Sequence, residues 1–177
     1  MPKNPLHPLL LETFIAFALA HPARFQQLRT YLWQYREAVT EERVSWSDLS
    51  HLSALNEGIA REILRHIGKL GQSAIRKLKA PAAIDPGQQE GTAKARFYHA
   101  QKIIGYSWET FEETFEAWKR IRNPLAHGEY SKAAPHLNQQ GLETFHLLVR
   151  SFNLMTLCYI GFPKAKFPNT DQWSLLG

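Results

Sequence analysis

Two residues whose side chains suit acid–base and phosphate chemistry, Arg122 and His127, lie five positions apart. The imidazole of His127 titrates near neutral pH, which makes it a candidate general acid or base. The guanidinium of Arg122 offers a fixed fork of donors that binds a phosphate group and stabilises charge developing on phosphorus. This pair of residue types predicts proton transfer beside a bound phosphate.

Arg122 also has a simpler interpretation, because it ends a predicted helix that begins at Trp108. Acidic residues dominate the start of this helix and basic residues its end: Glu109, Glu112, Glu113 and Glu116, then Lys119, Arg120 and Arg122. Such an arrangement matches both poles of the helix dipole. In this interpretation Arg122 complements the helix C-terminus and needs no ligand.

The backbone between Arg122 and His127 decides whether the two side chains can act together. Five residues along an unbroken helix rotate a side chain by about 140°. Pro124 removes a backbone donor and disfavours the helical conformation at Asn123. We therefore expect the helix to break at Asn123-Pro124 and a short new turn to end at Gly128, which turns Arg122 and His127 towards the same side.

The segment Arg122-Asn123-Pro124-Leu125-Ala126-His127 resembles the RNA-cleaving motif of HEPN-domain proteins. Members of that superfamily are helical bundles marked by Arg, a polar residue such as Asn, a few further residues and His. Gly128-Glu129 is a common continuation in several of its branches. The resemblance covers residues 118–130 as a motif and about 45–160 as an architecture. Tyr130 departs from one branch, whose modified Tyr lies two residues after the His and not three, so that modification is not expected here.

The resemblance implies an endoribonuclease that needs no metal or cofactor and works as a homodimer with its active site at the dimer interface. RNA supplies the 2′-hydroxyl as nucleophile, His127 is the general acid or base, and Arg122 stabilises the phosphate. Asn123 orients the phosphate or fixes the histidine tautomer. The implied products are a 2′,3′-cyclic phosphate and a 5′-hydroxyl end. The implied setting is a toxin or anti-phage defence effector controlled by an antitoxin or another regulatory protein.

A second group of cations lies earlier in the chain and predicts an RNA-binding surface. It consists of Arg61, Arg65, Lys69 and Arg76, joined by Lys77 and Lys79. Spacings of four residues place the first three on one side of a helix, where they are able to follow a phosphate backbone. A helix face that is merely solvated is the alternative.

The elements that must position these residues are all predicted to be helical, because apolar residues recur at intervals of three and four. The predicted helices span residues 9–20, 22–39, 47–70, 92–104, 108 to about 122, and 139–160, with a loop over 80–91. Ser47 is the predicted N-cap of the third helix. No segment alternates as a strand does. We therefore expect an all-α fold, a single-domain bundle of five to six helices over residues 1–177, with an N-terminal helical extension over 9–40, an HEPN-like core and an irregular tail over 162–177.

Composition limits the other function classes. Lys and Arg exceed Asp and Glu by 21 to 16, a net charge of +5, which favours an anionic partner such as RNA. Cys158 is the single cysteine, which indicates a reducing cytoplasm and excludes an intrachain disulfide. The eight histidines show no metal-ligand spacing, so no metal site is predicted. The apolar run over 9–20 imitates a signal peptide, but Glu12 interrupts it, and no run is long enough for a membrane span.

Other conspicuous side chains have structural interpretations. Trp108 and Trp118 share helical spacing with Phe111 and Phe115, which predicts core packing and not base stacking. His146 is expected to be a partly buried structural histidine. Glu57 is either an assisting carboxylate or a surface one, and His66 and His99 have no partner that the sequence identifies. Two further function classes therefore stay open: a non-catalytic HEPN-like module that binds a nucleotide, RNA or protein, and a purely structural helical protein.

Overall fold

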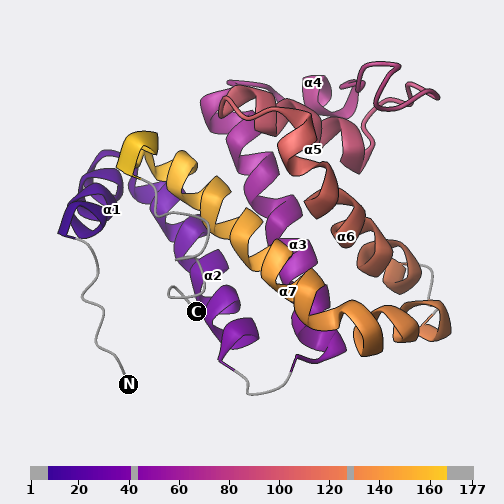
Figure 1. Cartoon of the computed structure of the whole chain (residues 1–177). Helices are drawn as coiled ribbons and strands as arrows, with labels where there is room; N and C mark the ends of the chain where they lie inside the picture. The colour runs from indigo at the N-terminus through magenta and orange to yellow at the C-terminus, as the bar shows by residue number, and fades with distance from the viewer. Residues whose placement is uncertain (1–7, 41–43, 127–129, 167–177) are drawn as a thin grey trace.

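The computed structural model describes residues 8–40, 44–126 and 130–166; the side chains of residues 110, 125, 126 and 130–140 are not part of that description. All regular structure in the described ranges is helical (Figure 1). The elements are α1 (Pro8–Ala20), α2 (Pro22–Val39), α3 (Trp46–Glu62), the π-helical turn η1 (Ile63–Ile67), α4 (Gln72–Arg76), α5 (Ala93–Ile103), α6 (Trp108–Ala126), α7 (Tyr130–Ile160) and the 3-10 turn η2 (Lys164–Lys166). The predicted all-α fold is confirmed.

Local capping chemistry explains where the central helix begins. Ser45 is the N-cap of α3, and its Oγ accepts a hydrogen bond from the backbone N–H of Asp48 at 3.3 Å. The Asp48 carboxylate in turn accepts the backbone N–H of Ser45 at 2.8 Å. The predicted cap, Ser47, is wrong, because the reciprocal pair needs the carboxylate three residues after the cap.

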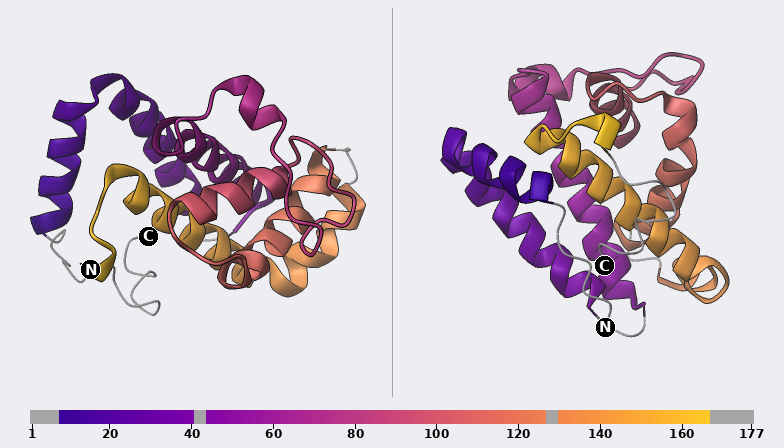
Figure 2. Two further views of the ribbon diagram at one scale, coloured as in Figure 1. Left: turned by 90° about the horizontal axis from the view of Figure 1, so that it is seen from above. Right: turned by 60° about the vertical axis from the view of Figure 1, so that its left-hand side comes forward.

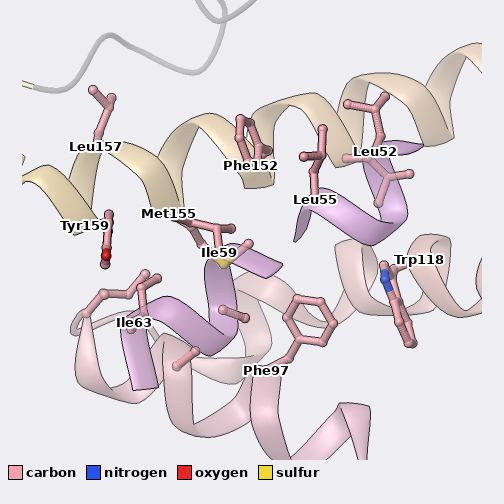
Figure 3. Packing of buried hydrophobic residues seen from close by; sticks show 14 of the residues in the cluster. Leu52, Leu55, Ile59, Ile63, Phe97, Trp118, Phe152, Met155, Leu157 and Tyr159 are labelled. Carbon is pink, nitrogen blue, oxygen red and sulfur yellow. The ribbon is translucent and has the colours of Figure 1, made fainter. Parts of the chain in front are cut away.

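Helix α3 lies at the centre of the bundle and packs against α2, α5, α6 and α7 (Figure 1). Figure 3 shows its side chains between those of α7 on one side and those of Phe97 and Trp118 on the other. Asn56 is 1% exposed and donates through Nδ2 to the carbonyls of Leu52, 2.8 Å away, and Leu148, 3.0 Å away. This buried amide fixes the position of α7 along α3, because its hydrogen bonds cannot be replaced by water.

A cluster of aromatic rings joins α5 to α6, as the helical spacing predicts. Trp108, Phe111, Phe115 and Trp118 are all at most 7% exposed. Phe97 of α5 contacts three of these rings, and the indole Nε1 of Trp118 donates to the Ser53 carbonyl of α3 at 3.0 Å. Helices α5 and α6 therefore pack against each other and against α3.

The predicted third helix, 47–70, is interrupted. Regular α-helix ends at Glu62, and η1 follows with a hydrogen bond from Gly68 N to Ile63 O at 2.9 Å. A Cβ added to Gly68 would lie 2.6 Å from Ile103 Cδ1 and 2.8 Å from the Leu64 carbonyl oxygen, so α5 and the preceding turn both pack closely against this residue. Lys69 then adopts a φ of 54°. The prediction of one continuous helix over 47–70 is wrong, because the chain passes into a π-helical turn at Ile63 that ends at Ile67.

The predicted break at Asn123-Pro124 is also wrong in its position. Helix α6 continues through Pro124 to Ala126, and α7 begins at Tyr130, earlier than the predicted residue 139. Proline in the last turn of a helix removes one backbone hydrogen bond, while the buried Ile121 holds the preceding turn against the core. The chain therefore changes direction after Ala126 and not between Arg122 and Pro124.

Arg24 of α2 links the first two helices to the end of α7. The Arg24 guanidinium lies 5.0 Å from the ring centroid of Phe17 and 4.6 Å from that of Tyr159, and its Nε donates to the Tyr159 hydroxyl at 3.1 Å. This contact joins α1, α2 and the end of α7. Within the described residues, none of the helices has the length and apolar character needed to cross a membrane. The end of the predicted tail, 167–177, lies outside the described residues.

Candidate functional site

Arg122 lies in the last turns of α6 with its side chain 40% exposed. Its ion pair is with Glu57 of α3, whose Oε2 lies 4.0 Å from Arg122 Nε. This separation is an electrostatic contact and exceeds hydrogen-bond distance. The donors of the Arg122 fork are therefore not consumed by Glu57.

Glu57 is the centre of a cluster that we call the arginine cluster: Glu57, Arg61, Arg96 and Arg122. The carboxylate is 14% exposed, and its Oε1 accepts hydrogen bonds from Arg61 Nη2 at 2.6 Å and from Arg96 Nη2 at 2.7 Å. The three arginines come from α3, α5 and α6. Glu57 is therefore a partly buried carboxylate paired with arginines, and its assisting role stays a prediction.

The arginine cluster carries an excess of positive charge, because three guanidinium groups surround one carboxylate, a sum of +3 − 1 = +2. Arg61 and Arg122 keep 48% and 40% of their side chains exposed, so part of each fork reaches solvent. Exposed arginine forks beside a partly buried carboxylate suit the bidentate binding of a phosphate group.

Arg96 was not identified from the sequence. Its side chain is 17% exposed, and its Nη1 donates to the carbonyl of Gly91 at 2.5 Å, opposite the bond to Glu57. One signal was present: α5 contains no acidic residue, so its cations find no partner within the helix. Arg96 therefore needs a carboxylate from another element, which sequence periodicity does not identify.

The other predicted RNA-binding residues do not form one helical stripe. Arg65 lies in η1 and contacts Glu62 at 3.4 Å and Gln72 at 2.9 Å. Lys69 follows η1, and the exposed Arg76 ends α4. Because η1 breaks the helical spacing, only Arg61 of the four joins Arg122. The RNA-binding role of the group stays a prediction.

The remaining motif residues divide into described and undescribed ones. The side chain of Asn123 is exposed one residue after Arg122. His127 lies outside the described residues, so its approach to Arg122 stays a prediction.

The structure gives partners to two histidines for which the sequence identified none. His66 Nε2 lies 3.2 Å from Glu62 Oε2, and His99 Nε2 lies 2.9 Å from the Lys79 carbonyl oxygen. His146 is exposed, contrary to its predicted partial burial.

Cys158 is a poor nucleophile in the folded protein. Burial raises the pKa of its thiol from 9.0 to about 11, although the nearby Lys164 partly offsets this rise. Since only the thiolate reacts, a rise of two pKa units lowers alkylation by iodoacetamide at pH 8 by about 100-fold relative to the unfolded chain. Mass spectrometry against pH should show the native rate increasing until about pH 11. Equal rates for native and urea-unfolded protein at pH 8 would contradict this.

No grouping of His, Cys, Asp and Glu suited to a metal ion occurs in the part of the chain that the structure describes. Comparison of the chain with protein-family models, with curated proteins and with solved structures gives no match in any of the three. The resemblance to HEPN proteins therefore depends on the motif from Arg122 to His127 and on the helical architecture.

Proposed function

We propose that the protein is a metal-independent endoribonuclease of the HEPN type. One observation supports this most directly: the partly exposed Arg122 lies in a cluster of net charge +2, directly before the Asn123…His127 part of the motif. The guanidinium group is preorganised by charge across three helices before any substrate binds. Preorganised donors are the usual source of transition-state stabilisation where negative charge develops on phosphorus.

In the proposed reaction the 2′-oxygen of RNA attacks the adjacent phosphorus while a base removes its proton. The bond from phosphorus to the 5′-oxygen breaks, and an acid protonates that oxygen, which leaves a 2′,3′-cyclic phosphate and a 5′-hydroxyl. Arg122 binds the non-bridging oxygens and His127 transfers a proton. Asn123 orients the phosphate or fixes the tautomer of the imidazole.

A homodimer with the active site at its interface is part of the proposal. Each chain carries one motif histidine, whereas the reaction needs an acid and a base. Helix α6 stays helical to Ala126, so the proposed approach of His127 to an Arg122 side chain, within one chain or between two, depends on residues outside the described ranges. The cytoplasmic role as a toxin or defence effector, with an antitoxin or regulatory partner, belongs to the same proposal.

The test is cleavage of a fluorescent RNA in EDTA by the purified protein. Arg122→Ala is expected to lower kcat by about 10²- to 10³-fold, because it removes the donors that stabilise the phosphorane-like transition state. Lys119→Ala is the matched control, since it removes a half-exposed cation one turn earlier in α6. Unchanged cleavage by a folded Arg122→Ala protein would refute the assignment of Arg122.

A second function, phosphate or RNA binding without cleavage, is favoured by one observation. The arginine cluster is complete without His127, since Glu57, Arg61, Arg96 and Arg122 all lie within the described helices. In that case Arg122→Ala weakens the binding of RNA, and the wild-type protein produces no cyclic-phosphate ends. A purely structural role is disfavoured, because the Arg122 fork is partly exposed and lies beyond hydrogen-bond distance of Glu57.

A further inference from the structure

Arg96 occupies a position in the arginine cluster that differs from those of Arg61 and Arg122. It is the most buried of the three, and its two terminal nitrogens donate in different directions, to the Glu57 carboxylate and to the Gly91 carbonyl. Its Nε is buried and has no hydrogen-bond partner among the described residues. A buried donor without a partner costs about 1–3 kcal/mol, so stability alone is a poor reason for arginine at this position.

The carbonyl that Arg96 binds belongs to a closely packed junction. Gly91 has a φ of +63°, its N–H donates to the Leu78 carbonyl at 2.8 Å, and an added Cβ would lie 2.5 Å from the Arg76 carbonyl oxygen. Both ends of the connection between α4 and α5 therefore meet beside Arg96. This connection lies on the side of the bundle away from α1 and α2 (Figures 1 and 2).

The same geometry fixes Glu57. Arg96 and Arg61 both bond Oε1 of that carboxylate, but Arg61 is 48% exposed and Arg96 is 17% exposed. The more buried bond is less screened and therefore determines the orientation of the carboxylate. The orientation of Glu57 in turn sets the charge that faces Arg122 Nε from Oε2.

We infer that Arg96 is a positioning residue: it holds Glu57, and through Glu57 the Arg122 fork, in the orientation that receives the phosphate of RNA. This inference rests on the proposed nuclease function. Arg96 does not touch the substrate in this arrangement. Lysine at this position keeps the charge but has no planar fork, so it cannot bond the Glu57 carboxylate and the Gly91 carbonyl in the same directions.

The kinetic test compares Arg96→Lys and Arg96→Gln with the wild-type protein. Both variants are expected to lower kcat for RNA cleavage by about 10- to 100-fold while KM changes by no more than about threefold, because misplacement affects the transition state more than binding. Arg29→Lys, an exposed arginine of α2, is the matched control and keeps wild-type kcat. Full rescue by Arg96→Lys would show that Arg96 supplies charge alone and would overturn the inference.

A spectroscopic test does not depend on cleavage. The Nε–H signal of Arg122, assigned by its loss in Arg122→Lys, is followed by ¹⁵N NMR at mildly acidic pH during titration with a 2′-deoxyoligonucleotide, which lacks the attacking hydroxyl. In Arg96→Lys the free-state signal is expected to move, while the oligonucleotide concentration needed for saturation changes by no more than about threefold. An Arg122 signal identical to the wild type, both free and saturated with oligonucleotide, would refute positioning.

The two proposals can fail separately. If the wild-type protein does not cleave RNA but the Arg122 signal responds to Arg96→Lys as described, the nuclease proposal fails and the positioning of Arg122 by Arg96 stands. Should Arg96→Lys not fold, Glu57→Gln keeps the Oε1 acceptor and removes the charge. The same displacement of the Arg122 signal is then expected, and an unchanged signal overturns the inference.

Discussion

Replacing His127 with alanine is expected to lower kcat for RNA cleavage by about 10²- to 10⁴-fold, the usual contribution of a positioned general acid or base. The motif contains no other side chain that titrates near neutral pH, so its proton-transfer step has no substitute within the chain segment. Cleavage of a fluorescent RNA in EDTA measures the effect, and the expected loss appears in kcat more than in KM because the proton moves in the transition state.

The control for this substitution is His146→Ala. His146 is an exposed histidine of α7 outside the arginine cluster, so its removal leaves cleavage unchanged. Circular dichroism and thermal melting must show that His127→Ala retains the fold. A folded His127→Ala protein with wild-type activity would eliminate the proposed mechanism, whatever the result for Arg122.

Replacing Phe97 with alanine is expected to destabilise the fold by about 3–5 kcal/mol, the range for deleting a buried aromatic ring. Phe97 is 1% exposed, and its ring centroid lies 5.4 Å from that of Phe111, 5.9 Å from that of Phe115 and 5.3 Å from that of Trp118. The loss removes contacts on both sides of the junction between α5 and α6. Urea unfolding measures the free energy of unfolding. An unchanged m value shows that unfolding still exposes the same amount of surface, so that the folded state is as compact as in the wild type.

Trp33→Ala is the matched aromatic control, because Trp33 is 63% exposed on α2. Its substitution is expected to change the free energy of unfolding by no more than about 0.5 kcal/mol. A destabilisation below about 1 kcal/mol for Phe97→Ala would mean that the aromatic cluster does not hold α5 to α6. The position of Arg96, the residue directly before Phe97, would then need another explanation.

Much of the fold was predictable because its signals are local. Pro22 begins α2, Thr92 caps α5 by accepting the Ala95 N–H, and the apolar spacing identified the buried face of α6. The predictions were wrong where residues distant in the sequence pack against the element concerned. The third helix changes into η1 after Glu62, and Gly68 beyond it packs against Ile103 of α5. Helix α6 continues past Pro124, which local rules treat as a break, and Ile121 one turn earlier is buried in the core.

The candidate site was predictable in part. Arg122 and Arg61 were identified from the motif and from the basic spacing, and both lie in the arginine cluster. The bond between Arg96 and Glu57 joins residues 39 positions apart, and no periodic pattern within a helix reports such a pair. A single sequence shows which side chains are suited to chemistry, whereas the buried partners that orient them depend on how helices cross.

The hydrogen bonds from the Asn56 amide to Leu52 and Leu148 also have a consequence for folding during translation. One acceptor, Leu52, lies four residues before it in the same helix, whereas Leu148 follows it by 92 residues in the chain. At a translation rate of about 5–20 residues per second, synthesis from Asn56 to Leu148 takes roughly 5 to 18 s. Over this time α7 is not yet present to cover the apolar face of α3. During that interval the nascent chain exposes the apolar surface that α7 covers in the finished bundle. A ribosome-bound chain that ends before α7 is therefore a candidate for chaperone binding.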